Sequence, residues 1–279
     1  MQVSPDAFVV VIPVTWGRDQ TDMIEEVHHE LWFEPMNLEW HDELADGAPE
    51  DAEATGTMTL EEGGPSEQVD EVDVVIEPRI EELKGVAAMA KEAFTASEAS
   101  MLTKHEKVWR LVVTPAQTDA EKGVDHVAAS QVAGRLMYTF AEAGAAGAFL
   151  PACGEMHSPS MIRDQTEDLT QVQALTNLFV SAWDEDGWMA TRGLTCFELP
   201  ELETEVQGSK FNEAFFRLMD VAANMIMQGE AYPVGGNLRV GDQQFTLEKG
   251  RQGPEDQKVP TAGTYGVLTV RPPKVSAGS

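Results

Sequence analysis

Short β-branched runs alternate with amphipathic helical patterns through the middle of this chain of 279 residues. The run Val108–Thr114 is typical of a strand, and Pro115 ends it. The pattern of residues 124–141 follows, with apolar side chains at every fourth position, and then the strand-like run Ala145–Pro151. Strands that alternate with helices form a sheet against which the helices pack. The middle of the chain therefore predicts an α/β (α+β) fold.

The two ends of the chain add further strands to this pattern. Residues 7–14 form a continuous β-branched run typical of a buried strand, and residues 72–77 predict a strand with one exposed face. Gly241 and Asp242 separate two extended segments, which indicates a tight hairpin turn. We therefore expect a mixed β-sheet with helices packed against it, in a single compact domain over residues 1–279. Helices are predicted near residues 22–33, 84–98, 124–141, 170–183 and 211–228, with further extended segments at 191–206 and 263–270.

The charge of the chain is strongly negative and unevenly distributed. The sequence has 48 acidic and 19 basic residues, which gives a formal net charge of −29. Between Asp19 and Glu82 there are 22 acidic residues and a single basic one, Arg79. Residues 42–70 are rich in Glu, Asp, Gly and Pro, so we expect a long flexible acidic loop. Such a surface suits either docking of a basic protein or adaptation to a salty environment.

Charge and hydropathy also exclude several classes of protein. Nucleic acids and anionic membrane surfaces require clustered Lys and Arg, so we expect neither as a partner. No apolar run approaches the roughly 20 residues of a membrane helix, and the run Phe8–Ile12 lacks the flanks of a signal peptide. The two cysteines, Cys153 and Cys196, do not make a disulfide framework, which favours a cytoplasmic protein with reduced thiols.

The motifs of common enzymes are missing from the sequence. We find no phosphate-binding P-loop, no nucleophile elbow and no His-Glu-x-x-His helix, and we predict no catalytic residue, metal or cofactor. The helix over 22–33 carries a Glu-x-x-His spacing, but its geometry places His29 on the solvent face. The apolar stripe predicted to be buried is Met23, Ile24, Val27 and Leu31. The aromatic residues Trp109, Trp183 and Trp188 are predicted to be core residues, because no basic residues interleave with them.

The best candidate for a ligand site follows the predicted strand Ala145–Pro151. Cys153, Glu155 and His157 occupy alternate positions there, and alternate residues of an extended chain share a face. Such a group can bind a ligand or metal, or pair a thiolate with an imidazole; otherwise Cys153 is a buried core residue. Neighbouring acids raise the pKa of a thiol, which opposes its use as a nucleophile. Arg192 is a further candidate, because it either pairs with nearby acids or binds the carboxylate of a ligand.

One stretch resembles a known protein family. Residues 188–203 read WMATRGLTCFELPELE, in which a Gly-Leu-x-x-Phe pattern runs into Pro-Glu-Leu-Glu. This stretch resembles DUF4261, a bacterial domain of unknown function, in which a helix and a short hairpin follow. The resemblance extends over residues 84–250 and is most specific over 187–203, although Glu198 stands where the family pattern has Gly. The family supplies no catalytic residues, and the tail at 271–279 lies beyond the resemblance.

These observations predict a non-enzymatic interaction or binding module with an acidic docking surface. The missing enzyme motifs and the concentration of acids in one part of the chain support it. The alternative is a small-ligand-binding protein or an enzyme with a pocket near Cys153–His157.

Overall fold

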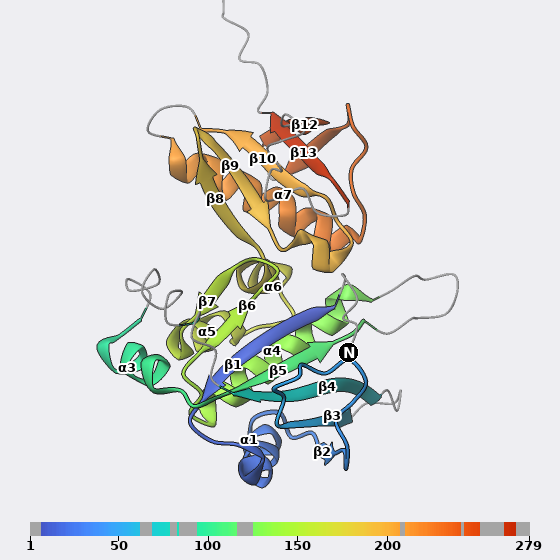
Figure 1. Cartoon of the computed structure of the whole chain (residues 1–279). Coiled ribbons are helices and arrows are strands. Elements are labelled where there is room, and N and C mark those ends of the chain that lie inside the picture. Colours follow the sequence, from blue (N-terminus) through green and yellow to red (C-terminus); the bar gives the residue numbers. More distant parts are fainter. Residues whose placement is uncertain are drawn as a thin grey trace, which may run out of the picture. The chain divides into compact units, whose positions relative to one another are not determined.

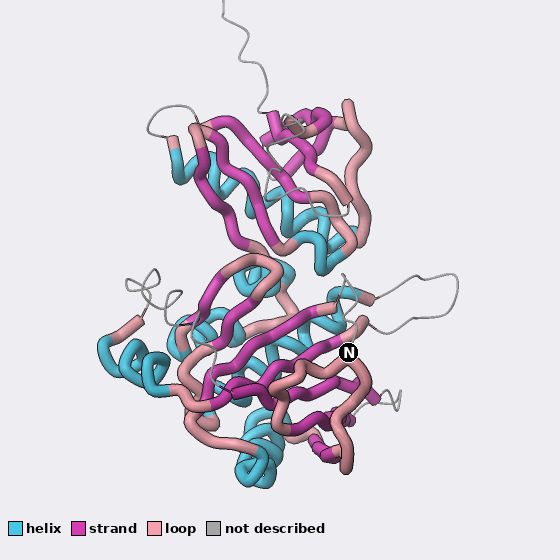
Figure 2. Tube along the Cα trace, viewed as in Figure 1, coloured by secondary structure: helices cyan, strands magenta, loops and turns pink. Residues whose placement is uncertain are grey.

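The computed structural model describes residues 7–61, 69–78, 83, 94–115, 125–206, 210–240, 243–251 and 265–271. The chain divides into two compact units, residues 1–170 and residues 171–279 (Figures 1 and 2). Each unit has its own β-sheet with helices packed against it, which confirms the α+β class. The structure thus has two units where we expected a single domain. The reason is that the strands of the two halves join separate sheets.

The first unit is built on a seven-stranded sheet in which all neighbouring strands are antiparallel. In spatial order its strands are β2 (Met36–Trp40), β3 (Ala54–Glu61), β4 (Val69–Pro78), β5 (Lys107–Val113), β1 (Phe8–Val14), β6 (Ala148–Leu150) and β7 (Glu155–His157). The strands β1 and β5 pair so that Ile12 stands opposite Trp109. They are the β-branched runs of the sequence, and burial on both faces explains their continuous apolar character.

Helices cover one face of this sheet, and on the other face the described residues place one helix, at the end with β6 and β7. The helices α1 (Thr21–Trp32) and α4 (His126–Glu142) pack together on one face, and α5 (Pro159–Thr166) packs against α4. On that face Trp109 of β5 is fully buried, with its ring centroid 5.3 Å from that of Phe140 in α4. On the other face α3 (Ala96–Lys104) buries Leu102 in a cluster with Met156 of β7. A capping box between Thr95 and Glu98 fixes the start of α3.

The second unit is built on a six-stranded mixed sheet. In spatial order its strands are β11 (Asn237–Val240), β12 (Gln243–Lys249), β13 (Val267–Arg271), β10 (Glu201–Glu205), β9 (Trp188–Arg192) and β8 (Ser181–Glu185). The strands β10 and β13 are parallel, and the other neighbouring pairs are antiparallel. The mixed sheet that we predicted is therefore found in this unit.

One long helix covers one face of this sheet. Helix α7 (Phe211–Gln228) buries Leu218, Ala222 and Met225, and α6 (Val172–Phe179) packs beside it. Gly229 ends α7 in the left-handed conformation, as its position in the sequence predicts. Figure 1 shows α7 behind β8, β9 and β10, so the opposite face of the sheet carries no helix among the described residues.

The prediction of a flexible loop over residues 42–70 is wrong for two parts of that range. Residues 54–61 form β3, which pairs along its whole length with β4 and, in part, with β2. In β3, Thr55, Thr57 and Thr59 alternate with Gly56, Met58 and Leu60, and Met58 and Leu60 are buried. This period of two indicates a half-buried strand, and the overall composition of the segment obscured it. The strand β4 also begins inside the range, and residues 62–68 lie outside the described residues.

Two further elements differ from the sequence expectations. The helix predicted at 170–183 ends at Phe179, because residues 181–185 pair with β9 as the edge strand β8. The extended segment 191–206 is interrupted by a short 3-10 helix, Leu194–Phe197, before β10. The turn residues Gly241 and Asp242 lie outside the described residues, but β11 and β12 pair as the predicted hairpin. Residues 84–93 and the tail after Arg271 also lie outside them.

Within the described residues, no helix combines the length and the apolar character needed to cross a membrane.

Candidate functional site

Cys153 lies in the tight turn between β6 and β7. Its side chain is buried, and its Sγ donates a hydrogen bond to the carbonyl oxygen of Leu150 at 3.6 Å. The thiol forms no disulfide. Burial and a backbone partner are typical of a structural cysteine that closes a turn. A solvent-facing nucleophile would instead be exposed at the strand end.

Glu155 and His157 lie on one face of β7, as alternate residues of a strand do. They stand opposite Leu150 and Ala148 of β6. His157 is only 4% exposed, while Glu155 is half-buried, and burial raises the pKa of its carboxyl. The structure thus brings Glu155 and His157 together on a strand and leaves Cys153 in the turn. No group of three or more His, Cys, Asp or Glu side chains suited to a metal ion occurs among the described residues.

Arg192, the fourth candidate, belongs to the second unit and lies on β9. Its guanidinium lies over the ring of Trp183 in β8, with 4.9 Å from the guanidinium carbon to the ring centroid. The indole Nε1 of Trp183 donates to the Oγ of Ser181 at 2.7 Å, which orients the ring. Arg192 Nε is buried and has no hydrogen-bond partner among the described residues. Ser181, Trp183 and Arg192 therefore form a small constellation on the helix-free face of the sheet.

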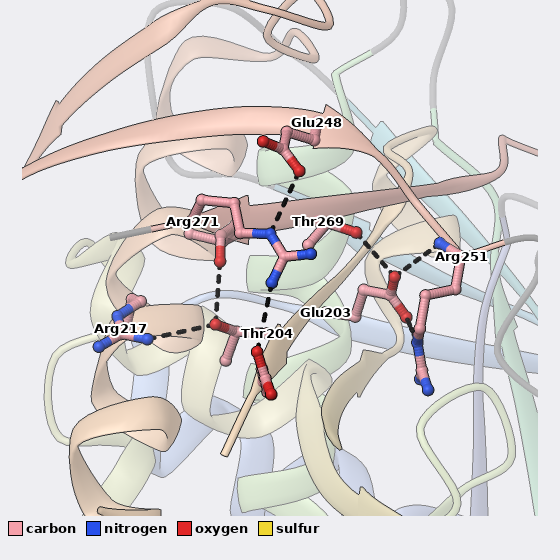
Figure 3. Close-up of polar contacts among 9 residues, drawn as sticks. Glu203, Thr204, Arg217, Glu248, Arg251, Thr269 and Arg271 are labelled. Carbon is pink, nitrogen blue, oxygen red and sulfur yellow. Dashed lines mark hydrogen bonds and ion pairs between the residues drawn. The ribbon is translucent and has the colours of Figure 1, made fainter. Parts of the chain in front are cut away.

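A second arginine–tryptophan stack lies on the same face. Arg251 lies 4.0 Å and Arg271 5.3 Å from the ring centroid of Trp188 on β9. Both arginines are neutralised within the unit, Arg251 by Glu203 and Arg271 by Glu205 and Glu248 (Figure 3). The sequence prediction that Trp183 and Trp188 are core residues is therefore wrong, whereas Trp109 is confirmed as core. The arginines reach the rings from other strands, a pairing that sequence spacing does not reveal.

The carboxylate of Glu203 is buried beneath this second stack. It accepts hydrogen bonds from Arg251 N at 2.7 Å, Arg251 Nε at 2.8 Å and Thr269 Oγ1 at 2.7 Å. Figure 3 shows these bonds beside Thr204, which faces α7 and accepts a hydrogen bond from Arg217. A buried carboxylate with three donors is satisfied, and it holds the end of β12 against β10 and β13.

Residues 191–201 form a compact turn around Glu201. One oxygen of this carboxylate accepts from Thr191 Oγ1 at 2.7 Å, and the other accepts from the backbone N–H of Gly193 at 2.9 Å. The same oxygen accepts from Thr195 N at 3.4 Å, so Glu201 binds the start of the 3-10 helix. Burial raises the pKa of the Glu201 carboxyl, and these hydrogen bonds oppose the rise. Glu198 ends the helix at φ 55°, a conformation that favours Gly.

Many exposed acids of the first unit lie between residues 19 and 53 and on β4. We call this set the acidic surface, and its members are Asp19, Asp22, Glu26, Glu30, Glu39, Asp42, Glu43, Asp46, Glu50, Asp51, Glu53, Glu71 and Asp73. Within the described residues, Glu53 is the only member that forms an ion pair, with Lys107. Between residues 19 and 61 the sequence contains no Lys or Arg. Within the part of the chain that the structure describes, the acidic surface therefore has almost no internal neutralisation.

Comparisons with models of known protein families, with curated proteins and with solved structures find no match to this chain.

Proposed function

We propose that this protein is an interaction module that docks a basic partner protein on the acidic surface of its first unit. The observation that carries the proposal is the uneven division of charge between the two units. Residues 1–170 contain 34 acidic and 10 basic residues, whereas residues 171–279 contain 14 acidic and 9 basic residues. The first unit therefore carries a net charge of −24 and the second unit −5, so most of the net negative charge belongs to the first unit.

The strand register supports a flat acidic patch on this unit. Glu39 of β2, Thr57 of β3 and Asp73 of β4 stand side by side across three strands. The next row on the same face consists of Asn37, Thr59 and Glu71. Neighbouring strands lie about 4.8 Å apart, so the outer side chains of a row are about 10 Å apart. Such spacing suits the Lys and Arg side chains of a partner that lies across the strands.

The uneven charge also favours docking over adaptation to a salty environment. Adaptation of the whole surface to salt would enrich both units in acids, because both are exposed to the same solvent. The second unit is instead much closer to balance, and three of its acids, Glu203, Glu205 and Glu248, pair with arginines on the helix-free sheet face. A localised excess of acid is what a docking surface for a basic protein requires.

The alternative function, a ligand or catalytic pocket at Cys153–His157, has less support. Cys153 is buried with its thiol bonded to the backbone. A pocket there would need Cys153 to leave the turn, which no other observation favours.

The test is the binding of a decalysine peptide to the full chain, measured by calorimetry at about 50 mM and about 300 mM salt. The acidic-surface variant carries Glu39→Gln, Glu71→Gln and Asp73→Asn. The matched control carries Asp184→Asn, Glu213→Gln and Glu230→Gln, which removes the same charge from exposed positions of the second unit. We expect the first variant to weaken binding at least about tenfold, or about 1.4 kcal/mol, and the control to leave it nearly unchanged.

Equal weakening by the two variants would show that only the net charge attracts the peptide, and would contradict a local docking surface. Binding that persists unchanged at the higher salt concentration would also contradict a charge-driven contact.

A further inference from the structure

The helix-free sheet face of the second unit carries two arginine–tryptophan stacks, and only one of them includes a carboxylate. In the stack on Trp188, Arg251 is bonded to the carboxylate of Glu203. In the stack on Trp183, Arg192 has no carboxylate partner among the described residues. The first stack shows how a carboxylate binds to an arginine that rests on an indole, and the second stack has an arginine on an indole without a carboxylate.

The terminal nitrogens of Arg192 are available to a ligand. They are not among the buried nitrogen atoms without a partner, and no hydrogen bond or ion pair joins them to another described residue. Both therefore reach solvent, although the Nε of the same guanidinium is buried. Five described arginines do pair with a carboxylate, so the absence of such a partner at Arg192 calls for a physical cause.

Arg192 lacks a carboxylate partner because the acid beside it on the neighbouring strand, Glu201, is hydrogen-bonded elsewhere. Glu203 of β10 stands opposite Ala190 of β9. Two residues away on each strand, the same antiparallel register places Glu201 opposite Arg192. The Glu201 carboxylate is turned away to accept hydrogen bonds from Thr191 and Gly193. Because those bonds fix the turn after β9, Glu201 does not neutralise Arg192. Among the described residues, the guanidinium of Arg192 thus stays without a carboxylate partner.

The constellation is also rigid before any ligand binds. The bond from Trp183 Nε1 to Ser181 fixes the ring, and the ring supports the planar guanidinium of Arg192. A preordered guanidinium loses little conformational entropy when it binds a carboxylate through two parallel hydrogen bonds. Trp183 is 36% exposed, so part of the indole remains open to an apolar group attached to that carboxylate.

We infer that Arg192, supported by Trp183 and Ser181, is a binding site for a carboxylate that carries an adjacent aromatic or apolar group. The inference is independent of the docking function of the first unit. Two kinds of ligand carry a carboxylate next to such a group: a small aromatic acid, and a peptide whose C-terminal residue is aromatic. In both, the carboxylate accepts two hydrogen bonds from Arg192 and the apolar group covers the exposed part of the indole.

The test uses the full chain and follows the indole and guanidinium N–H signals by nitrogen–proton NMR. The first arm titrates phenylacetate, with neutral phenylacetamide as its isosteric control. The second arm titrates the peptide Gly-Gly-Phe with a free terminus, with the same peptide amidated as its control. We expect both acids to shift the signals of Trp183 and Arg192 with millimolar affinity, and both amides to bind at least about tenfold more weakly.

The variants separate binding from folding. Arg192→Gln should abolish the shift of Trp183, and Arg192→Lys should lose most of it, because an ammonium cannot present the planar fork. Arg239→Gln removes an equal charge from the opposite edge of the same sheet and should bind like the unchanged chain. Unshifted signals for the rest of the unit check that each variant is folded.

Binding of the free peptide terminus alone would support the site and identify a chain end as its ligand. The inference is overturned if neither acid shifts Trp183, if the amides bind as well as the acids, or if Arg192→Gln binds as well as the unchanged chain.

Discussion

At the scale of single residues, Glu198 and His28 are two described residues in costly environments. Glu198 has a positive φ in the turn after the 3-10 helix, and His28 is fully buried between α1 and α4. The buried stripe of α1 is Ile24 and His28, which are spaced by four residues, while Val27 is only partly buried. The burial of the polar His28 was not predicted from the sequence, because the apolar side chains of Met23, Ile24, Val27 and Leu31 form a stripe beside it. The observed buried face of α1 is rotated about the helix axis from the predicted one by less than the angle between consecutive residues.

Glu198→Gly should stabilise the protein relative to Glu198→Ala by about 1 kcal/mol. Gly adopts the left-handed conformation without the steric cost that a Cβ imposes. Both substitutions remove the same exposed hydrogen bond from Tyr265, at 3.3 Å, so their comparison isolates the backbone term. Urea unfolding of the two variants provides the measurement. An Ala variant as stable as the Gly variant would show that the turn relaxes.

Protonation of His28 should destabilise the fold at acid pH. Burial lowers the pKa of His28 from 6.5 to about 4, while its Nδ1 contacts Thr139 Oγ1 at 3.0 Å. Between these two pH values the unfolded chain binds the proton and the folded chain does not, so stability is lost as the pH falls from 6.5 towards 4. The loss attributable to His28 should be about 3 kcal/mol at most.

His28→Gln should remove most of this pH dependence, whereas His29→Gln, an exposed neighbour on the same helix, should not change it. Unfolding measured in urea at about pH 7 and about pH 4.5 makes the comparison. If the free energy of unfolding changed equally with pH in His28→Gln and in the unchanged chain, His28 would not be a buried neutral imidazole.

At the scale of secondary-structure elements, the sequence predicts strong local patterns and misses elements that depend on pairing. The helices α4 and α7 and the strands β1 and β5 are all found near their predicted positions, because each carries a periodic apolar pattern. The edge strand β8 was predicted as part of a helix, since its identity depends on pairing with β9. The candidate site shows the same limit. Cys153 to His157 follow a strand as expected, but turn geometry separates Cys153 from the other two.

Gly56→Ala tests the new assignment of β3 as a strand. A Cβ at this position would lie 2.7 Å from the carbonyl oxygen of Glu39 and 3.0 Å from the ring of Trp40. Because the first neighbour is backbone in a paired strand, we expect a loss of about 2 kcal/mol in the free energy of unfolding. Thr59→Ala, on the outer face of the same strand, should cost less than about 1 kcal/mol. If Gly56→Ala is no more destabilising than Thr59→Ala in urea, residues 54–61 are not held in the sheet.

At the scale of the whole molecule, the chain combines two units of different charge and different surface chemistry. The first unit presents the acidic surface, which is formed by residues between 19 and 53 and by β4. The second unit is much closer to balance and presents arginines stacked on tryptophans on a helix-free sheet face. The sequence alone revealed the concentration of acids but not the boundary near residue 170, because sheet membership decides that boundary.

The most direct measurement of the central claim is the hydrogen-exchange footprint of a bound decalysine peptide on the full chain. A partner docked on the acidic surface should slow amide exchange in α1, β2, β3 and β4 and in residues 41–53, with little change in residues 171–279. Protection spread evenly over both units, or confined to the second unit, would contradict a localised acidic docking surface.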